Sequence, residues 1–86
     1  MKQYVYTVKS PLGIHVRASG MIVKLAKEYA DTAISISCNG KEEKATSLMK
    51  LMALGVKQGN KITVTAKGAN EDTAILAMSR FVNNNL

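Results

Sequence analysis

The chain has one cysteine, one histidine, one proline and no tryptophan among its 86 residues. A single cysteine cannot form an internal disulfide bond, and it excludes a cysteine-rich zinc site. One histidine in addition leaves no convincing set of metal ligands, so we expect neither a metal ion nor another cofactor. Cys38 shares the parity of Ile34 and Ile36 in a predicted strand, and this pattern favours a buried structural thiol.

Long apolar runs are also missing, because no stretch approaches the roughly 18 residues that a membrane span requires. The N-terminal Met-Lys-Gln-Tyr-Val segment has no apolar signal core either. We therefore expect a cytoplasmic protein that does not bind a membrane. The length predicts a single domain, residues 1–86, with one modest core. Such a domain has no room for a deep pocket and a lid, so its function is expected on the surface or at a loop.

Acidic residues are few, since six Asp and Glu stand against 12 Lys and Arg and leave a net charge of +6. This excess favours acidic partners, which could be acidic protein faces, phosphorylated ligands or nucleic acid. Aromatic residues make up only 5% of the chain, and the predicted outward strand positions are mostly Ser, Thr and Lys. A protein that stacks nucleic-acid bases on aromatic rings is therefore disfavoured.

Hydropathy periodicity predicts four strands and three helices in the order β-α-β-β-α-β-α. The strands are expected at Lys2–Lys9, Ala33–Cys38, Lys41–Ala45 and Lys61–Lys67, and the helices at Val16–Tyr29, Leu48–Leu54 and Glu71–Asn83. Asn39-Gly40 is typical of a two-residue hairpin turn. The order predicts an α+β fold, an open-faced two-layer sandwich with a four-stranded antiparallel sheet covered on one face by three helices.

The first and last helices are each expected to bury one apolar stripe against the sheet. The stripe of the first helix is Ala18, Met21, Ile22, Leu25, Ala26 and Tyr29. The stripe of the last helix is Ala74, Ile75, Met78, Phe81 and Val82.

The only histidine lies in Gly13-Ile14-His15-Val16-Arg17-Ala18, where a loop meets the first predicted helix. A lone histidine in such a place is most often an ordinary surface residue. A helix N-terminus, however, presents unpaired backbone N–H groups and a partial positive charge that suit a phosphate. The same field favours the neutral, nucleophilic imidazole, and Arg17 can add a charge-assisted contact to an anion. These residues are chemically suited to holding a phosphoryl group.

Two segments resemble HPr, the family of histidine phosphocarriers of the bacterial phosphoenolpyruvate-dependent sugar phosphotransferase system. The segment around His15 resembles the family's active-site loop. The segment Lys-Ala-Thr-Ser-Leu-Met-Lys-Leu-Met-Ala-Leu-Gly, residues 44–55, resembles its regulatory-serine segment. The hairpin turn, the last strand and the last helix also fall where the family places them, so the resemblance covers essentially the whole chain and implies an HPr-like fold.

The resemblance implies a phosphoryl carrier and not an enzyme. Phosphorylated enzyme I would pass a phosphoryl group to Nδ1 of His15, and Arg17 would stabilise that group. His15 would then hand it to a sugar-specific EIIA protein or domain, for sugar uptake and phosphorylation. Two residues depart from the family pattern. Ala18 stands where the pattern His-x-Arg-Pro has proline, and Leu12 replaces a small polar residue, so we expect slower or weaker transfer.

Ser47 precedes the second predicted helix, where an N-cap alone would explain a serine. The resemblance adds that this serine would be the target of HPr kinase/phosphorylase, with a catabolite-control transcription factor as a further partner. Phosphate at Ser47 would place negative charge in the surface that meets acidic partners and would oppose docking. Thr46 is a competing hydroxyl, and Lys50 stands where regulated relatives usually have a small residue.

The second predicted helix has more apolar residues than one face of so short a helix can bury. Leu51 and Leu54 are expected in the core, which leaves Leu48, Met49 and Met52 as an exposed patch for protein docking. In the family this patch adjoins the histidine. Four basic residues are expected to ring the patch and steer acidic partners toward it: Arg17, Lys24, Lys27 and Lys50.

Two alternatives to a monomeric phosphocarrier stay open from the sequence. The first is an HPr-like regulatory paralogue that acts only by binding a protein, although such paralogues typically lack the histidine. The second is a small basic nucleic-acid-binding domain. Which sugars depend on the chain cannot be predicted, because in the family that specificity lies in the partners.

Overall fold

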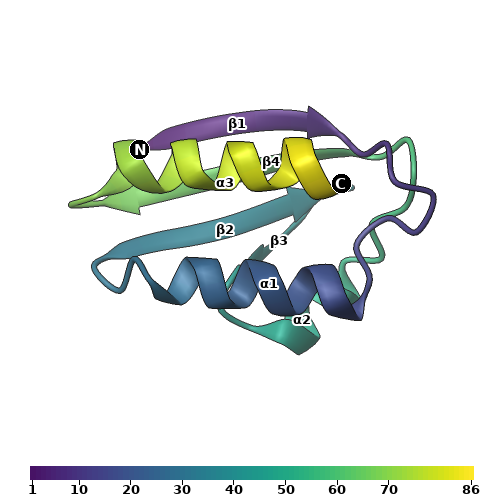
Figure 1. The fold of residues 1–86 in the computed structure, drawn as a ribbon, viewed down its shortest axis with the longest axis horizontal. Coiled ribbons are helices and arrows are strands. Elements are labelled where there is room, and N and C mark those ends of the chain that lie inside the picture. The colour runs from purple at the N-terminus through teal and green to yellow at the C-terminus, as the bar shows by residue number, and fades with distance from the viewer.

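The computed structural model describes residues 1–86 and contains the seven predicted elements in the predicted order (Figure 1). The strands are β1 (Lys2–Thr7), β2 (Thr32–Cys38), β3 (Lys41–Lys44) and β4 (Lys61–Gly68). The helices are α1 (Val16–Lys27), α2 (Leu48–Ala53) and α3 (Glu71–Asn85). Their bounds differ from the predicted ones by no more than two residues, the usual uncertainty at the ends of elements.

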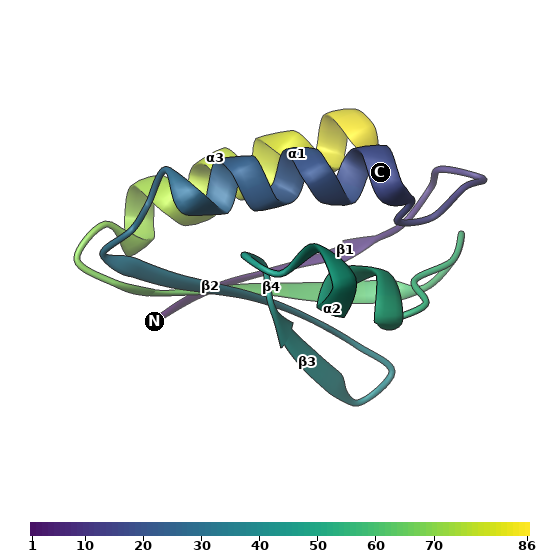
Figure 2. The same cartoon turned by 90° about the horizontal axis from the view of Figure 1, so that it is seen from below.

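The four strands form one antiparallel sheet in the order β1-β4-β2-β3. The hairpin between β2 and β3 turns at Asn39 and Gly40, with φ values of 54° and 81°. Both positive values are those of the turn that the Asn-Gly pair predicts. Helices α1 and α3 lie side by side over one face of the sheet, and α2 packs against α1 and β3 (Figure 2). The predicted α+β sandwich with one open sheet face is thereby confirmed.

A single hydrophobic core lies between the sheet and the helices. In β1, β2 and β4, alternate residues enter this core, whereas the charged strand β3 contributes none. The sheet contributes Tyr6, Ile34, Ile36, Cys38, Ile62, Val64 and Ala66, and the helices contribute Ala18, Ile22, Ala26, Leu51, Ala74, Met78 and Val82. Cys38 is buried as predicted, and its burial raises the pKa of the thiol.

The prediction that Met21 belongs to the buried stripe of α1 is wrong, because its side chain is 46% exposed. Ser19 is fully buried instead. The reason is that α2 packs against α1 and covers the side of the helix that carries Ser19. The Ser19 Oγ donates a hydrogen bond to the Met52 Sδ at 3.3 Å. The buried side of α1 is therefore turned toward α2, and Met21 is left at the surface.

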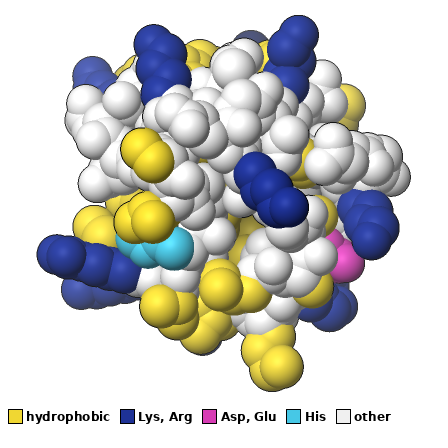
Figure 3. Space-filling model, turned by 90° about the vertical axis from the view of Figure 1, so that its right-hand side faces the viewer, with side chains coloured by type: hydrophobic (Ala, Val, Ile, Leu, Met, Phe, Trp, Pro, Cys, Tyr) yellow, Lys and Arg dark blue, Asp and Glu magenta, His cyan; other side chains and the backbone are white.

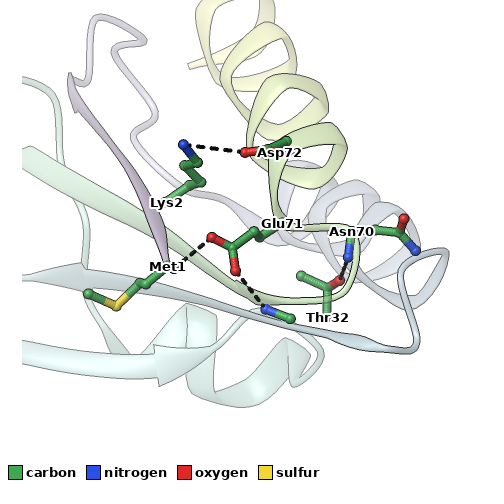
Figure 4. A network of polar contacts seen from close by, with 7 residues as sticks. Met1, Lys2, Thr32, Asn70, Glu71 and Asp72 are labelled. Carbon is green, nitrogen blue, oxygen red and sulfur yellow. Dashed lines mark hydrogen bonds and ion pairs between the residues drawn. The ribbon is translucent and has the colours of Figure 1, made fainter.

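Polar contacts fix the N-terminus of α3 to the sheet (Figure 4). The Glu71 carboxylate accepts a hydrogen bond from the Gly68 N–H at 3.3 Å and lies 2.6 Å from the Met1 amine. The Asn70 N–H donates to the Thr32 hydroxyl at 3.0 Å. Because this end of α3 is held, the position of its opposite end next to the loop before α1 is also determined.

No helix has both the length and the apolar character that crossing a membrane requires. No three or more His, Cys, Asp or Glu side chains gather in an arrangement that could hold a metal ion.

Candidate functional site

The loop before α1 is anchored by close contact between Gly13 and the segment that follows α2. Gly13 has a φ of 62°, a conformation that glycine adopts without the steric cost of a Cβ atom. A Cβ at this position would lie 2.8 Å from the Lys57 Cα and nearer still to the Val56 carbonyl oxygen. The next residue, Ile14, is buried and donates its N–H to that same oxygen at 3.2 Å. The backbone just before His15 is thus positioned against the body of the protein.

His15 is the N-cap residue of α1, with extended backbone dihedrals of −113° and 174°. Its carbonyl oxygen accepts the Ser19 N–H at 2.9 Å and so begins the helix. Its side chain caps the first turn, because Nδ1 accepts the Ala18 N–H at 3.4 Å. A neutral imidazole that accepts at Nδ1 carries its proton on Nε2. The ring therefore presents an unprotonated Nδ1 at the positive end of a helix.

A shallow depression of about 300 Å³ lies beside His15, and its walls are His15, Arg17, Ala18, Met21 and Asn85. The structure brings the two predicted site residues, His15 and Arg17, together here. None of the wall residues is acidic, and neither ion pair of the structure involves Arg17. The depression thus combines an imidazole, an unpaired guanidinium and helix N–H groups, which are the groups that stabilise a phosphoryl anion.

Asn85 was not predicted to belong to this site. It is close to the far end of the chain, and the Asn83–Asn85 run has no spacing signal that would link it to His15. The C-terminus of α3 reaches the site because the Leu86 carbonyl oxygen accepts the Lys9 and Ser10 N–H groups at 2.6 and 2.7 Å. The Asn85 Nδ2 donates to the Phe81 carbonyl oxygen at 2.9 Å, which leaves its Oδ1 without a partner in the structure.

Ser47, the predicted regulatory serine, is the N-cap residue of the short helix α2. Ser47 is half-buried, its carbonyl oxygen accepts the Leu51 N–H at 3.1 Å, and its Oγ accepts the Lys50 N–H at 3.4 Å. The predicted N-cap is confirmed. Thr46 is exposed one residue earlier and makes no capping hydrogen bond. Both hydroxyls are accessible from solvent, and the cap bond would have to break or rearrange if Ser47 carried a phosphate.

Several apolar groups lie around the histidine on this face of the molecule (Figure 3). Within α2, Leu51 is fully buried and Leu54 nearly so, whereas Leu48, Met49 and Met52 are exposed as predicted, Met49 by 83%. We call these last three residues the α2 patch. The structure adds three exposed apolar residues, close to His15 in the sequence, that were not predicted to lie at the surface: Leu12, Val16 and Met21. Leu12 lies in a turn, and Val16 and Met21 lie in α1. Their apolar side chains resemble those of core residues in the sequence, and only the structure shows that they are exposed.

The four basic residues of the predicted ring are all exposed, but they differ in their distance from His15. Arg17 lines the depression, and Lys50 belongs to α2. Lys24 and Lys27 lie in the last turn of α1, roughly 13 and 18 Å further along the helix axis than its first turn at 1.5 Å per residue. Figure 3 shows basic side chains on several sides of these apolar groups and little acidic surface on this face.

Comparison with known proteins gives one consistent family. The family model described as "PTS HPr component phosphorylation site" matches residues 2–84. Phosphocarrier protein HPr of Buchnera aphidicola is 37% identical over 75 residues, 87% of each chain. Phosphocarrier protein HPr of Mycoplasma pneumoniae is 36% identical over 78 residues, 91% of this chain and 89% of the relative. The solved structure of a mycoplasma histidine-containing phosphocarrier protein superposes with a TM-score of 0.92 at 28% identity, covering 96% of this chain and 93% of that one.

Proposed function

Because the chain belongs to the HPr family of phosphocarrier proteins of the phosphotransferase system, we propose that His15 is its phosphoryl acceptor and Arg17 the residue that stabilises the phosphoryl group. The protein is a phosphoryl carrier and not an enzyme, and its partners are those of the phosphotransferase system, such as enzyme I and EIIA proteins. Neither alternative, the regulatory paralogue or the nucleic-acid-binding domain, is favoured by this family membership.

One observation supports His15 most strongly. It is the chain's only histidine, and its unprotonated Nδ1 lies at the N-terminus of α1 in an open depression with the unpaired Arg17. Nδ1 can attack phosphorus directly, because its lone pair needs no base to remove a proton first. The guanidinium and the helix N–H groups then offset the phosphoryl charge. The depression is shallow, so a partner protein can reach the nitrogen from outside.

We propose that enzyme I and a sugar-specific EIIA protein or domain dock in turn on the apolar surface beside His15. The α2 patch is exposed, as are Leu12, Val16 and Met21, and Met21 also lines the depression. Methionine side chains are flexible and can adapt to more than one partner. Arg17, Lys24, Lys27 and Lys50 would attract acidic faces, with Arg17 and Lys50 closest to the contact.

We further propose that phosphorylation of Ser47 by an HPr kinase/phosphorylase regulates the carrier, with Thr46 as the weaker candidate. Ser47 lies next to the α2 patch, so its phosphate would repel acidic partners. Aspartate is as good an N-cap as serine. Ser47→Asp should therefore keep the stability of the protein but slow its phosphorylation by enzyme I, whereas Ser47→Ala should lose about 1 kcal/mol of stability and keep the rate. Binding of a catabolite-control transcription factor would depend on the same residue.

Three broader expectations complete the proposal. Residues 1–86 would act as one domain, the protein would be a monomer, and it would work in the cytoplasm, where phosphoenolpyruvate is available. The partner surface would then be free on each molecule, and no second copy would be needed to complete the site.

The test is phosphorylation by enzyme I, phosphoenolpyruvate and Mg²⁺, followed by intact-mass measurement and acid treatment. We expect one added phosphoryl group that is lost in acid and absent in His15→Ala. Labelling that persists in a folded His15→Ala protein would refute the assignment. A failure to label the unmodified protein with two enzymes I, one of them cognate, while a known HPr is labelled, would favour the regulatory paralogue.

A further inference from the structure

The backbone N–H of Ala18 is the only hydrogen-bond donor to the His15 side chain in the structure, at 3.4 Å from Nδ1. Ala18 is the third residue of α1, so its N–H is one of the groups at the start of a helix that have no partner within the helix. The residue is almost completely buried. Its N–H contacts the His15 ring, and Ala18 and His15 both line the open depression.

The hydrogen bond and the transfer reaction require the same electron pair. A neutral imidazole has a single in-plane lone pair, on its unprotonated nitrogen, and here that lone pair accepts the Ala18 N–H. If Nδ1 attacks phosphorus, the lone pair becomes the new N–P bond and can no longer accept a hydrogen bond. The Ala18 N–H must therefore leave Nδ1 during transfer, at the moment when phosphoryl oxygens arrive beside it.

We propose that Ala18 is a positioning residue whose N–H holds Nδ1 as the unprotonated nitrogen of the resting ring and then donates to a phosphoryl oxygen in the phosphorylated protein. The proposal rests on His15 being the acceptor. In the step itself, the Nδ1 lone pair forms the N–P bond, and the bond between phosphorus and the donor atom of the phosphorylated partner breaks. The electron pair of the broken bond stays with that donor atom, and the proton of His15 remains on Nε2.

This donor depends on the residue type at position 18. The HPr pattern His-x-Arg-Pro has proline there, and proline has no backbone N–H. The chain therefore has one donor at the reacting nitrogen that a proline-containing site lacks. The loss of a fixed φ at this position predicts slower transfer, as argued from the sequence. The added donor instead affects the equilibrium between the free and phosphorylated forms, so the two effects can be measured separately.

The direction of the equilibrium effect follows from the strengths of the two hydrogen bonds. The resting bond of 3.4 Å is longer than the usual 2.9–3.0 Å and joins two neutral groups, so it is weak. A bond from the same N–H to a phosphoryl oxygen is charge-assisted and stronger. The exchange favours the phosphorylated protein, by roughly three- to tenfold in the equilibrium constant for phosphorylation.

The test compares the unmodified protein with Ala18→Pro, which removes the N–H, and with Ala18→Ser, which keeps it. Each variant is mixed with the unmodified protein, a limiting amount of phosphoenolpyruvate and a catalytic amount of enzyme I. Intact mass then gives the phosphorylated fraction of both proteins at a shared equilibrium. A protein with lactate in place of Ala18, and hence an ester in place of the amide, removes the N–H without adding the proline ring.

We expect the phosphorylated-to-free ratio to be roughly three- to tenfold lower in Ala18→Pro and in the ester protein, and within about twofold of the unmodified protein in Ala18→Ser. On phosphorylation of the unmodified protein, the Ala18 amide proton should shift downfield in NMR spectra and exchange more slowly with solvent. In the resting protein, the imidazole ¹⁵N shifts should show a larger share of protonated Nδ1 when the N–H is removed.

Equal ratios in folded Ala18→Pro and ester proteins, or an Ala18 amide proton that does not respond to phosphorylation, would overturn the proposal. These outcomes are separate from failure of the proposed function, which would appear as phosphorylation of His15→Ala or as no phosphorylation of the unmodified protein. The ¹⁵N shifts of the resting protein require no phosphorylation, so they test the resting hydrogen bond in either case.

Discussion

Gly13 and Gly55 provide a matched pair of substitutions that measure how the loop before His15 is anchored. Their φ values are nearly identical, 62° and 64°. A Cβ at Gly55 would have no atom within 4 Å, whereas one at Gly13 would lie at or within 3.0 Å of backbone atoms of Val56 and Lys57. Alanine at either position is strained by the left-handed conformation. Only at Gly13 would its Cβ also collide with backbone atoms, those of Val56 and Lys57.

The expected losses of stability can be worked out from these two terms. The left-handed conformation costs an alanine about 1–2 kcal/mol, partly offset by the smaller entropy of the unfolded chain. Gly55→Ala should therefore lose about 1 kcal/mol. Gly13→Ala should lose about 2 kcal/mol more, within the range of strain that overpacking produces. For a domain of this size the difference corresponds to a melting temperature lower by roughly 8–16 °C.

The assay is thermal and urea unfolding of both variants, together with the initial rate of phosphorylation by enzyme I. Gly13→Ala has to displace the Val56 carbonyl oxygen that also holds the Ile14 N–H, so the His15 backbone should move with it. We expect at least a tenfold slower phosphorylation, since misplacement by about 1 Å can cost 100-fold. Equal stability losses in the two variants, or an unchanged rate in Gly13→Ala, would refute this account of the loop.

Three further predictions concern other parts of the molecule. Gly20→Ala should raise the free energy of unfolding by about 0.5–1 kcal/mol in urea titrations, because Gly20 lies inside α1 with open space around it. Met49→Asp should raise the Kd for enzyme I about tenfold in calorimetry, whereas Leu76→Asp, at a residue that is also exposed but lies on α3, should leave it unchanged. The hydrogen bond and charge of the N-terminal amine lower the pKa of Glu71, so stability should fall as the pH drops below 4.5, and less steeply in Glu71→Gln.

Features that depend on neighbouring residues could be predicted from the sequence. The Asn39-Gly40 turn needs two residues with positive φ, and this pair adopts such values readily. The Ser47 cap needs only a hydroxyl before a helix. The division of α2 into buried Leu51 and exposed Met49 followed from its shortness, since so small a helix cannot bury all its apolar residues.

Features that depend on distant segments could not be predicted in the same way. Asn85 lies 70 positions from His15 in the sequence, and the packing of α3 together with the hydrogen bonds of the Leu86 carbonyl oxygen brings it to the depression. The exposure of Met21 depends on how α1 is rotated, and this rotation is fixed by the packing of α2 on the Ser19 side. Helical periodicity shows which residues of a helix share a face. It does not show which of two neighbouring faces a second helix covers.

The composition of the depression is suited to a carrier that must both receive and release a phosphoryl group. Strong binding of the phosphoryl group on His15 would favour its arrival. It would also raise the barrier to its departure, because lowering the free energy of the phosphorylated form increases the activation energy of the next transfer. The depression has a single cation, Arg17, and otherwise neutral groups such as the Ala18 N–H. The α2 patch beside it is apolar and exposed. Further positive charge in the transition state would therefore have to come from the docked partner, which makes fast transfer dependent on docking and leaves the free phosphorylated protein only moderately stabilised.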